Sequence, residues 1–338
     1  MEYSVLNTAK NHANKRGKHM YHCIVNPSAR SGKGKEIWQK LEYKLLEKGL
    51  DYSAYMTKGP GDATRIAERI TDSDEEEIKL VVLGGDGTLN EVINGIKDFE
   101  KTLVGYIPIG SSNDFARDLA FSKKVDDLID KIVSGDIRRN LDLGKLTYNS
   151  MSRETSRLHD DRISVTRLFD VSAGIGFDAA VCEQALSSGT KNFFNKIGLG
   201  KLTYGSIALR QLFGAEKVPC DIILDNGETV HLNRFIFIAA MIHHYEGGGF
   251  NFAPGADLTD GKFDLVYAGN MPGARMLIAL PFSFFGHYFW INGIGHHLVQ
   301  KVTIKTEKPM WVHTDGEVSV KSDHITFECL KQKLRMMN

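Results

Sequence analysis

The chain has 338 residues, of which 42% are hydrophobic and 25% are charged, values typical of a globular protein. Lys plus Arg and Asp plus Glu each number 42, so the zero net charge provides no general attraction to nucleic acid. One hydrophobic core rarely serves more than about 300 residues, so this length favours two domains. The four cysteines are widely spaced, which is typical of reduced thiols in a cytoplasmic protein.

Two segments bear on membrane targeting. Residues 1–18 are polar and basic and lack an apolar core segment, so we expect a loose N-terminal extension rather than a secretory signal. Residues 276–300 carry no Asp, Glu, Lys or Arg, and that length raises the question of a membrane span. Pro281, Gly286 and the pair His296-His297 interrupt this segment, which favours a buried or interfacial segment over a span.

The first part of the chain alternates short apolar runs with helical patterns. Strands are expected at residues 22–26, 51–57, 79–83 and 103–110. Apolar residues at helical spacing follow the first three of these runs. This alternation is typical of a parallel sheet with crossover helices, in which ligands bind beyond the carboxyl ends of the strands. We therefore expect four loops to face one crevice, those at Asn26, Thr57, Gly84 and Gly110.

The stretch Gly84-Gly85-Asp86-Gly87-Thr88 joins one of these strands to a helix. Backbone N–H groups converge at such a helix start, which suits phosphate, and we expect the glycines to adopt positive φ and to approach a ligand closely. Asp86 would repel phosphate unless a cation lay between them, so it indicates Mg²⁺ with a nucleoside polyphosphate. A tight turn is the alternative, and the density of glycines disfavours it. The basic segment 28–35 is a second, weaker candidate phosphate loop; a solvated basic loop is an equal alternative there.

From about residue 142 the pattern changes to short strands with polar gaps. They are expected at residues 141–146, 162–173, 218–224, 229–242 and 262–268, with a helical insertion over 177–213. The turn signal Asp225-Asn226-Gly227 adds to this pattern, which predicts a mostly β second domain.

Two further patterns resemble binding sites. Residues 174–179 fit the G-x-G-x-x-A dinucleotide fingerprint, but no βαβ unit follows, so a second nucleotide site is rejected. The pairs His243-His244 and His296-His297 could suggest zinc. Because adjacent side chains point apart on a strand, structural or rim histidines are favoured.

Several motifs in order resemble the diacylglycerol kinase catalytic-domain family, which includes bacterial soluble lipid kinases and the sphingosine and ceramide kinases. The Gly84–Val92 stretch resembles its signature, and Pro108–Arg117 resembles its P-x-G-T-x-N-D-F-A-R element. Gly174–Ala179 resembles its G-x-G-F-D-A motif. Asn26-Pro27, the glycines at 247–249, Pro254–Ala256, Asp260-Gly261 and Asp315-Gly316-Glu317 follow the family's order across residues 20 to 335.

The resemblance implies a two-domain lipid kinase fold. An α/β nucleotide domain like those of phosphofructokinase and NAD kinase is expected over residues 19–143. A β-sandwich lipid-substrate domain is expected over 144–325, and residues from about 326 to 338 return to the first domain. A cleft between the domains would hold ATP·Mg²⁺ and admit the lipid headgroup.

The same resemblance implies roles for individual residues. ATP contacts are expected from Asn26, Thr57, Gly84, Gly85, Asp86, Gly87, Thr88, Leu89, Asn90 and Ser111. Asp86 would hold the catalytic Mg²⁺, and Asp114 and Asp142 would support that network. Asp315 would accept the proton of the lipid hydroxyl; from the residues alone, a β-turn aspartate is the simpler interpretation. A structural Mg²⁺ is implied at Asp260 with the main-chain carbonyls of Asp257 and Lys262, where a hairpin turn is the alternative.

The chain departs from the family pattern at three places. Ser111 stands where Thr is usual and keeps the hydroxyl, whereas Gly32 is displaced in the first loop, which leaves its phosphate contacts open. The bulky stretch His243–Glu246 replaces an Asn-rich one, which leaves the lipid specificity open.

The resemblance predicts an ATP-dependent lipid kinase that phosphorylates a hydroxyl of a diacylglycerol-like or sphingoid lipid. The alternatives are an NAD kinase-like small-molecule kinase and a catalytically inactive nucleotide-binding regulator. The expected partners are ATP, Mg²⁺ and a lipid presented at a membrane surface, without nucleic acid; a homodimer is left open. We expect a cytoplasmic protein that associates peripherally with membrane. The aromatic stretch Phe282–Trp290 would suit that contact, and a core helix is the alternative.

Overall fold

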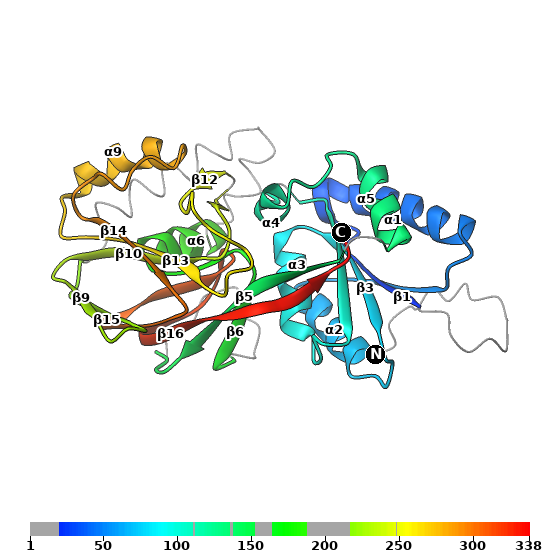
Figure 1. Cartoon of the computed structure of the whole chain (residues 1–338), viewed down its shortest axis with the longest axis horizontal. Coiled ribbons are helices and arrows are strands. Elements are labelled where there is room, and N and C mark those ends of the chain that lie inside the picture. The colour runs from blue at the N-terminus through cyan, green and yellow to red at the C-terminus, as the bar shows by residue number, and fades with distance from the viewer. Residues whose placement is uncertain (1–19, 111, 136–137, 153–163, 188–216, 248) are drawn as a thin grey trace. The chain divides into compact units, whose positions relative to one another are not determined.

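The computed structural model describes residues 20–110, 112–135, 138–152, 164–187, 217–247 and 249–338 (Figure 1). It divides into two compact units, one comprising the chain up to Asp142 with Lys331–Asn338, the other Leu143–Leu330. The N-terminal extension expected over residues 1–18 lies outside the described residues.

The first unit alternates strands and helices along the chain. Its elements are β1 (Tyr21–Val25), α1 (Ala29–Glu47), β2 (Tyr52–Met56), α2 (Asp62–Thr71), β3 (Ile78–Gly84), α3 (Asp86–Gly95), β4 (Thr102–Pro108), α4 (Asp114–Asp118), α5 (Val125–Ser134) and the start of β5 (Arg139–Tyr148). The strands lie in the order β4-β3-β1-β2 and all pair in parallel. The predicted parallel sheet with crossover helices is confirmed.

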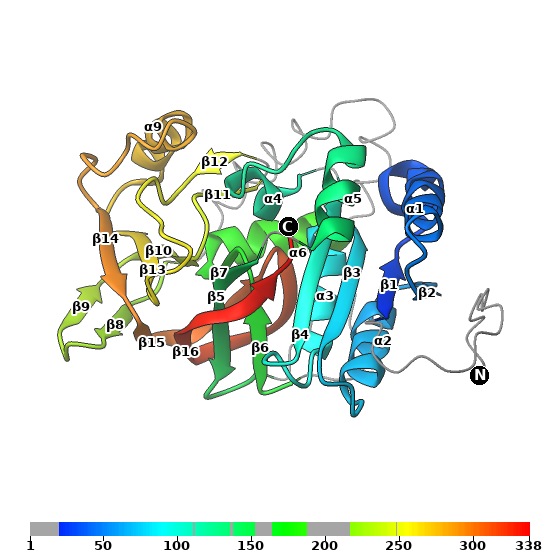
Figure 2. The same cartoon turned by 45° about the vertical axis from the view of Figure 1, so that its right-hand side comes forward.

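The strands of this sheet are buried on both faces, which explains their continuous apolar runs. Alternate residues such as Cys23, Val81 and Leu83 pack in one cluster with apolar side chains of α1 and α5. Their neighbours, including Ile24 and Val82, are also buried and point to the opposite face, where α2 and α3 lie (Figure 2).

The last strand, β16 (Glu317–Met336), extends into the first unit beside β4. Met336 pairs in parallel with Val104, and the Met337 N–H donates to the Val104 carbonyl at 2.9 Å. The Asn338 side chain continues this pairing, because its Nδ2 donates to the Tyr106 carbonyl at 2.7 Å and its Oδ1 accepts from the Tyr106 N–H at 3.1 Å.

The second unit is mostly β, as predicted. Its elements are the remainder of β5, β6 (Thr166–Phe169), β7 (Ser172–Gly176), α6 (Phe177–Ser187), β8 (Cys220–Leu224), β9 (Thr229–Leu232), β10 (Phe235–Met241), β11 (Tyr245–Glu246), β12 (Phe250–Asn251), β13 (Phe263–Gly269), α9 (Gly273–Ser283), β14 (Ile294–Val299), β15 (Lys301–Thr314) and most of β16. Antiparallel pairs join β14-β13-β10-β7-β15-β16, and β8 pairs with both β15 and β9. Side chains from ten strands of this unit share one hydrophobic core.

Two predictions for this unit need correction. The strand expected over residues 162–173 is interrupted, giving β6 and β7, and the one over 229–242 gives β9 and β10. Polar contacts interrupt the pairing at both places: the Asp315 carboxylate accepts the N–H groups of Asp170 and Val171, and Asn270 accepts the N–H of Arg234. The predicted insertion begins as α6, and its continuation from residue 188 lies outside the described residues.

The uncharged segment 276–300 forms most of α9 and the strand β14. The strand was not predicted, because the segment lacks the alternation that marks a half-buried strand. His296 and His297 point apart on β14, as expected: His296 contacts Asp264 at 2.5 Å and His297 contacts the Tyr267 hydroxyl at 3.2 Å. Among the described residues, no helix is long and apolar enough to span a membrane.

We expect Asn338→Ala to lower the free energy of unfolding by about 2–3 kcal/mol, because it leaves the buried N–H and carbonyl of Tyr106 without these partners. Urea denaturation measures the change. Lys331→Ala, at an exposed position of β16, should change this free energy by less than about 0.5 kcal/mol. Equal values for the two variants would contradict this role of Asn338.

Candidate active site

The turn between β3 and α3 is tightly packed. A Cβ on Gly84 would lie 2.4 Å from the Cβ of Thr88, so only glycine fits there. Gly85 has φ −91°, and none of Gly84, Gly85 and Gly87 has a positive φ. The expectation of left-handed glycines was therefore wrong; close packing explains Gly84, and Asp86 begins α3 directly after the turn.

A second turn packs against the first, backbone to backbone. A Cβ on Gly110 would lie 2.7 Å from the Gly85 Cα, and the Ile109 N–H donates to the Gly84 carbonyl at 2.8 Å. The Asn113 side chain holds this second turn, because its Oδ1 accepts from the Gly110 N–H and its Nδ2 donates to the Gly110 carbonyl. The loops after β3 and β4 thus form one compact ridge.

The Asp86 carboxylate lies at the edge of this ridge and is half-buried. Its Oδ2 accepts from the backbone N–H of Asp114 at 3.2 Å, and its Oδ1 lies 3.5 Å from the Tyr106 hydroxyl. Asp114 begins α4 and is itself buried, with Arg117 3.7 Å from its Oδ1. The Asp114 N–H therefore joins two aspartates that were predicted from separate motifs.

The loop after β1 reaches the same ridge. Asn26 donates from Nδ2 to the Thr88 hydroxyl at 3.2 Å, and the Thr57 N–H donates to the carbonyl of Val25 at 2.9 Å. The basic loop expected over residues 28–35 is largely helical, since α1 begins at Ala29. It packs closely on Asn26, as a Cβ on Gly34 would lie 2.2 Å from the Asn26 carbonyl oxygen.

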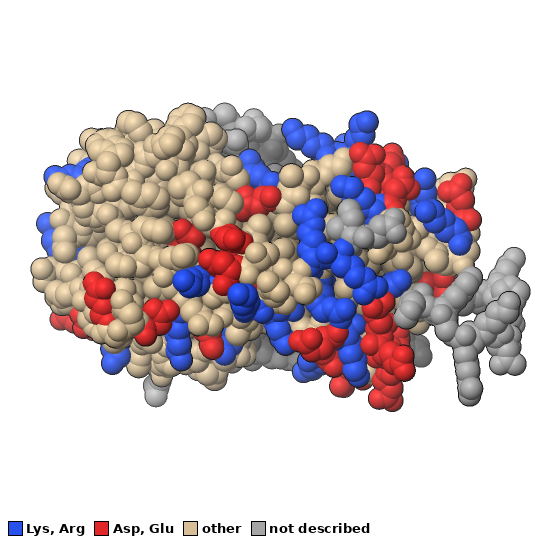
Figure 3. Space-filling view, in the orientation of Figure 1, with Lys and Arg blue, Asp and Glu red and all other residues tan. Residues whose placement is uncertain are grey.

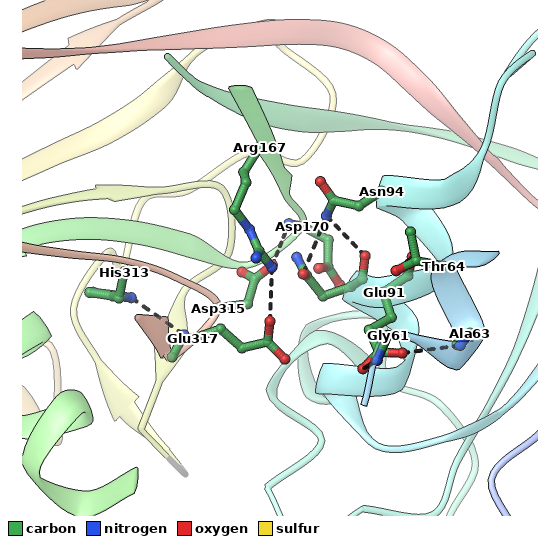
Figure 4. Close-up of polar contacts among 12 residues, drawn as sticks. Gly61, Ala63, Thr64, Glu91, Asn94, Arg167, Asp170, His313, Asp315 and Glu317 are labelled. Atoms are coloured by element: carbon green, nitrogen blue, oxygen red, sulfur yellow. Dashed lines mark hydrogen bonds and ion pairs between the residues drawn. The ribbon is translucent and has the colours of Figure 1, made fainter. Parts of the chain in front are cut away.

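Glu91 was not singled out from the sequence, yet it anchors the loop after β2. Its carboxylate accepts the N–H groups of Gly61 and Ala63 at 2.9 and 3.1 Å, at the start of α2 (Figure 4). Asp62 holds the same loop by accepting the N–H groups of Lys58 and Gly59. Burial raises the pKa of Asp62, but these donors and the ion pair with Arg65 outweigh burial, so the pKa lies below its usual value.

Two predicted ATP contacts, Leu89 and Asn90, and the predicted Mg²⁺ network residue Asp142 are buried. The side chains of Leu89 and Asn90 are fully buried on the inner side of α3. Asp142 is also buried, and its Oδ1 accepts from the Gln332 N–H at 2.6 Å, where β16 enters the first unit. Ser111 lies outside the described residues.

In the second unit, Asp315 and Gly316 form the two-residue turn that joins β15 to β16, with Thr314 paired to Glu317. Both turn residues have positive φ, 48° and 77°, the type I′ geometry that favours Asp-Gly in tight hairpins. The interpretation of Asp315 as a β-turn aspartate is therefore correct.

The Asp315 carboxylate, however, faces the start of β7. Its oxygens accept the N–H groups of Asp170, Val171 and Ser172 at 2.9–3.0 Å. Glu317, across the turn, pairs with Arg167 at 2.8 Å (Figure 4). A carboxylate held by three backbone donors has a fixed position, as an acid–base residue requires.

The loop of residues 257–262 precedes β13. The Asp257 carboxylate accepts the N–H and the hydroxyl of Thr259, and the Asp260 carboxylate accepts the Lys262 N–H at 2.8 Å. Exposed carboxylate and carbonyl oxygens are the donors that Mg²⁺ prefers, so the composition of the loop fits this ion. Within the described ranges, no group of three or more His, Cys, Asp or Glu side chains is placed to hold a metal.

Comparison with known proteins adds to this geometry. Residues 20–146 match the model of the diacylglycerol kinase catalytic domain, and residues 171–338 match the YegS C-terminal NAD kinase beta sandwich-like domain. A Bacillus subtilis (strain 168) protein named "Putative lipid kinase YtlR" is 29% identical over 87% of this chain and 92% of its own length. A diacylglycerol kinase of Staphylococcus carnosus (strain TM300) is 28% identical over 87% of each chain.

A solved structure shares the fold. It was described as a putative diacylglycerol kinase from Bacillus anthracis str. Sterne, and it superposes with a TM-score of 0.71 over 97% of both chains at 22% identity. The predicted α/β domain followed by a β-sandwich domain is thereby confirmed.

The motifs and the two matched domains define a lipid kinase, an enzyme that transfers a phosphoryl group to an alcohol. The chain belongs to the diacylglycerol kinase catalytic-domain family.

We expect Gly110→Ala to destabilise the first unit by about 1–3 kcal/mol, because the added Cβ would meet the backbone of Gly85, which cannot rotate away. Thermal unfolding measures the change. Gly59→Ala is the matched control, since a Cβ there meets nothing within 4 Å. If Gly110→Ala unfolds at the same temperature as the control, the two turns are not in obligatory contact.

Proposed function

We propose that this lipid kinase transfers the γ-phosphate of ATP to a hydroxyl of a diacylglycerol-like or sphingoid lipid, giving phosphatidic acid or an analogous lipid phosphate. In this proposal residues 19–143, with about 326–338, are the ATP-binding domain, and residues 144–325 are the lipid-substrate domain. The observation that carries the proposal is the ridge of Gly85 and Gly110 with the Asp86 carboxylate at its edge.

The phosphates of ATP are proposed to lie against the start of α3. The first N–H groups of a helix have no partner within the helix and attract anions. Gly87 is exposed and Gly85 half-buried there, with Gly84 buried behind them. Asn26 and Thr88, which are hydrogen-bonded to each other, border the turn. Thr57 and Ser111 complete the proposed set, whereas Leu89 and Asn90 would act from within the helix, because their side chains are buried.

The residues present fit a divalent cation. Mg²⁺ binds through one or two carboxylates together with substrate phosphates. Asp86 is half-buried at the turn, and Asp114, whose N–H it accepts, is proposed as the supporting carboxylate. Asp142 is proposed to support this network from β5. When bound, Mg²⁺ would neutralise the charge of the phosphates during transfer. A second, structural Mg²⁺ is proposed at Asp260 with the carbonyls of Asp257 and Lys262.

Asp315 is proposed as the base that takes the proton of the attacking lipid hydroxyl. Phosphoryl transfer needs a residue that orients the nucleophile and accepts its proton. The three N–H groups that Asp315 accepts keep its carboxylate in one position, which supports this role.

The test is phosphorylation of dispersed diacylglycerol by wild type, Asp86→Asn and Asp315→Asn. Each substitution removes a carboxylate charge, so we expect turnover to fall about 100-fold or more. Asp221→Asn, at a half-exposed carboxylate of the second unit that pairs with His231, should keep wild-type turnover. Wild-type turnover by both active-site variants would show that these assignments are wrong.

The same assay separates the alternatives. A panel of diacylglycerol, sphingoid lipids and NAD, with product masses measured, distinguishes a lipid kinase from an NAD kinase-like enzyme. Nucleotide binding without turnover of any acceptor would support a regulator instead.

We also propose that the second unit presents an aromatic patch to the membrane, defined as Phe282, Phe284, Phe285 and Trp290. These side chains are 42–68% exposed, and the surface over α9 is largely uncharged (Figure 3). The opposite side of α9 packs Met276 and Ala279 in a buried cluster. Exposed Phe and Trp suit the bilayer interface, where the lipid substrate resides.

Co-sedimentation with phosphatidylcholine vesicles containing diacylglycerol tests the patch. We expect Phe285→Asp/Trp290→Glu to lower the bound fraction several-fold, because both charges would have to enter the interface. Tyr43→Asp/Leu46→Glu is the control, since these side chains of α1 are comparably exposed, at 64% and 58%. Unchanged binding by the patch variant would show that the aromatic patch does not contact the membrane.

A further inference from the structure

His313, two residues before Asp315 in the sequence, belongs to a buried cluster of charged side chains. His313, in β15, has a side chain with no exposed surface, and its Nε2 lies 3.0 Å from Asp178 Oδ2 and 3.6 Å from Glu246 Oε1. Burial of an ionisable side chain costs free energy unless its partners compensate. The proposed chemistry assigns no role to this cluster.

Gly174 leaves the space that the cluster occupies. It is paired with His313 across β7 and β15. A Cβ on Gly174 would lie 2.0 Å from Asp178 Oδ2 and 2.6 Å from His313 Nε2. The imidazole therefore crosses the neighbouring strand to reach α6 only because this position is glycine. This contact gives the first glycine and the aspartate of the Gly174–Ala179 motif a physical reason other than dinucleotide binding.

The cluster joins three elements of the second unit. His313 belongs to β15, which leads into the hairpin of Asp315, while Asp178 lies in the first turn of α6 and Glu246 ends β11. Burial lowers the pKa of His313, but the carboxylates of Asp178, Glu246 and Asp315 outweigh burial and raise it to about 9. The Gly316 N–H also lies 3.3 Å from His313 Nδ1, so the ring contacts the Asp315-Gly316 turn directly.

We propose that His313 is a positioning residue, which fixes the Asp315 hairpin relative to α6 and β11 through the Asp178 and Glu246 carboxylates. The proposal rests on the proposed role of Asp315 as the base. Small displacements of an acid–base group from its working position lower the rate of the chemical step while leaving distant binding contacts unchanged. His313 should therefore affect kcat and leave the KM for ATP unchanged, because the proposed ATP contacts lie in the other unit.

The test compares steady-state lipid phosphorylation by the full-length wild type, His313→Gln, Asp178→Asn and the double variant. We expect each single variant to lower kcat about tenfold or more, and the double variant to be no slower than the slower single variant, because both remove one interaction. Gly174→Ala keeps both side chains and forces them apart, so it should lower kcat even if His313→Gln does not fold.

His296→Gln is the matched control, because it removes another His–Asp pair of the same unit, that with Asp264. It should keep the wild-type kcat even if it lowers the melting temperature.

A second readout is the pH dependence of stability. Because folding raises the pKa of His313 from 6.5 to about 9, the protonated ring contributes its full stabilisation below pH 6.5. This contribution is lost as the pH rises to 9. The difference in melting temperature between wild type and His313→Gln should shrink over that range.

The outcomes separate this proposal from the function on which it rests. Loss of activity in Asp315→Asn with wild-type kcat in a folded His313→Gln and in Gly174→Ala would overturn the positioning role alone. An equal loss in His296→Gln would also overturn it, since general destabilisation would then explain the effect. A wild type that phosphorylates no lipid would overturn both proposals.

Discussion

The contact between the backbones of Gly85 and Gly110 is the constraint on which the first unit's candidate site depends. A Cβ on Gly110 would lie 2.7 Å from the Gly85 Cα, and one on Gly85 would lie 3.1 Å from the Gly110 Cα, so the turns after β3 and β4 meet closely because both residues are glycine. This meeting brings the N–H of Asp114 to the carboxylate of Asp86. The loop after β1 joins through Asn26, whose amide reaches Thr88. A parallel sheet brings these loops to one edge, and glycine packing then fixes their spacing.

In the second unit, backbone N–H groups likewise position the carboxylate of Asp315. Asp315 occupies a type I′ turn that most residue types resist, and three N–H groups at the start of β7 bind its oxygens. The turn therefore serves both the hairpin and the presentation of a fixed carboxylate. His313, two residues before Asp315, makes a buried contact with Asp178. The segment from His313 to Gly316 therefore combines left-handed backbone, hydrogen bonds to the carboxylate and buried charge.

The parallel sheet and the mostly β second unit could be predicted because apolar periodicity and turn residues are local signals. Side-chain contacts across the fold were not local, and they account for what was missed. The carboxylate of Glu91 caps α2 from a neighbouring helix, and Gly174 makes room for a pair formed by two other elements. The glycines at 84 and 85 were predicted correctly as special, but for the wrong conformation, since close approach rather than positive φ requires them.

The central claim is that this member of the diacylglycerol kinase family transfers the γ-phosphate of ATP to a lipid hydroxyl. The most direct measurement follows labelled γ-phosphate from ATP into extracted lipid, with the product identified by mass. We expect label in phosphatidic acid or in an analogous lipid phosphate, in proportion to the ATP consumed. ATP consumption that leaves the lipid unlabelled, or label found in phosphorylated NAD, would contradict it.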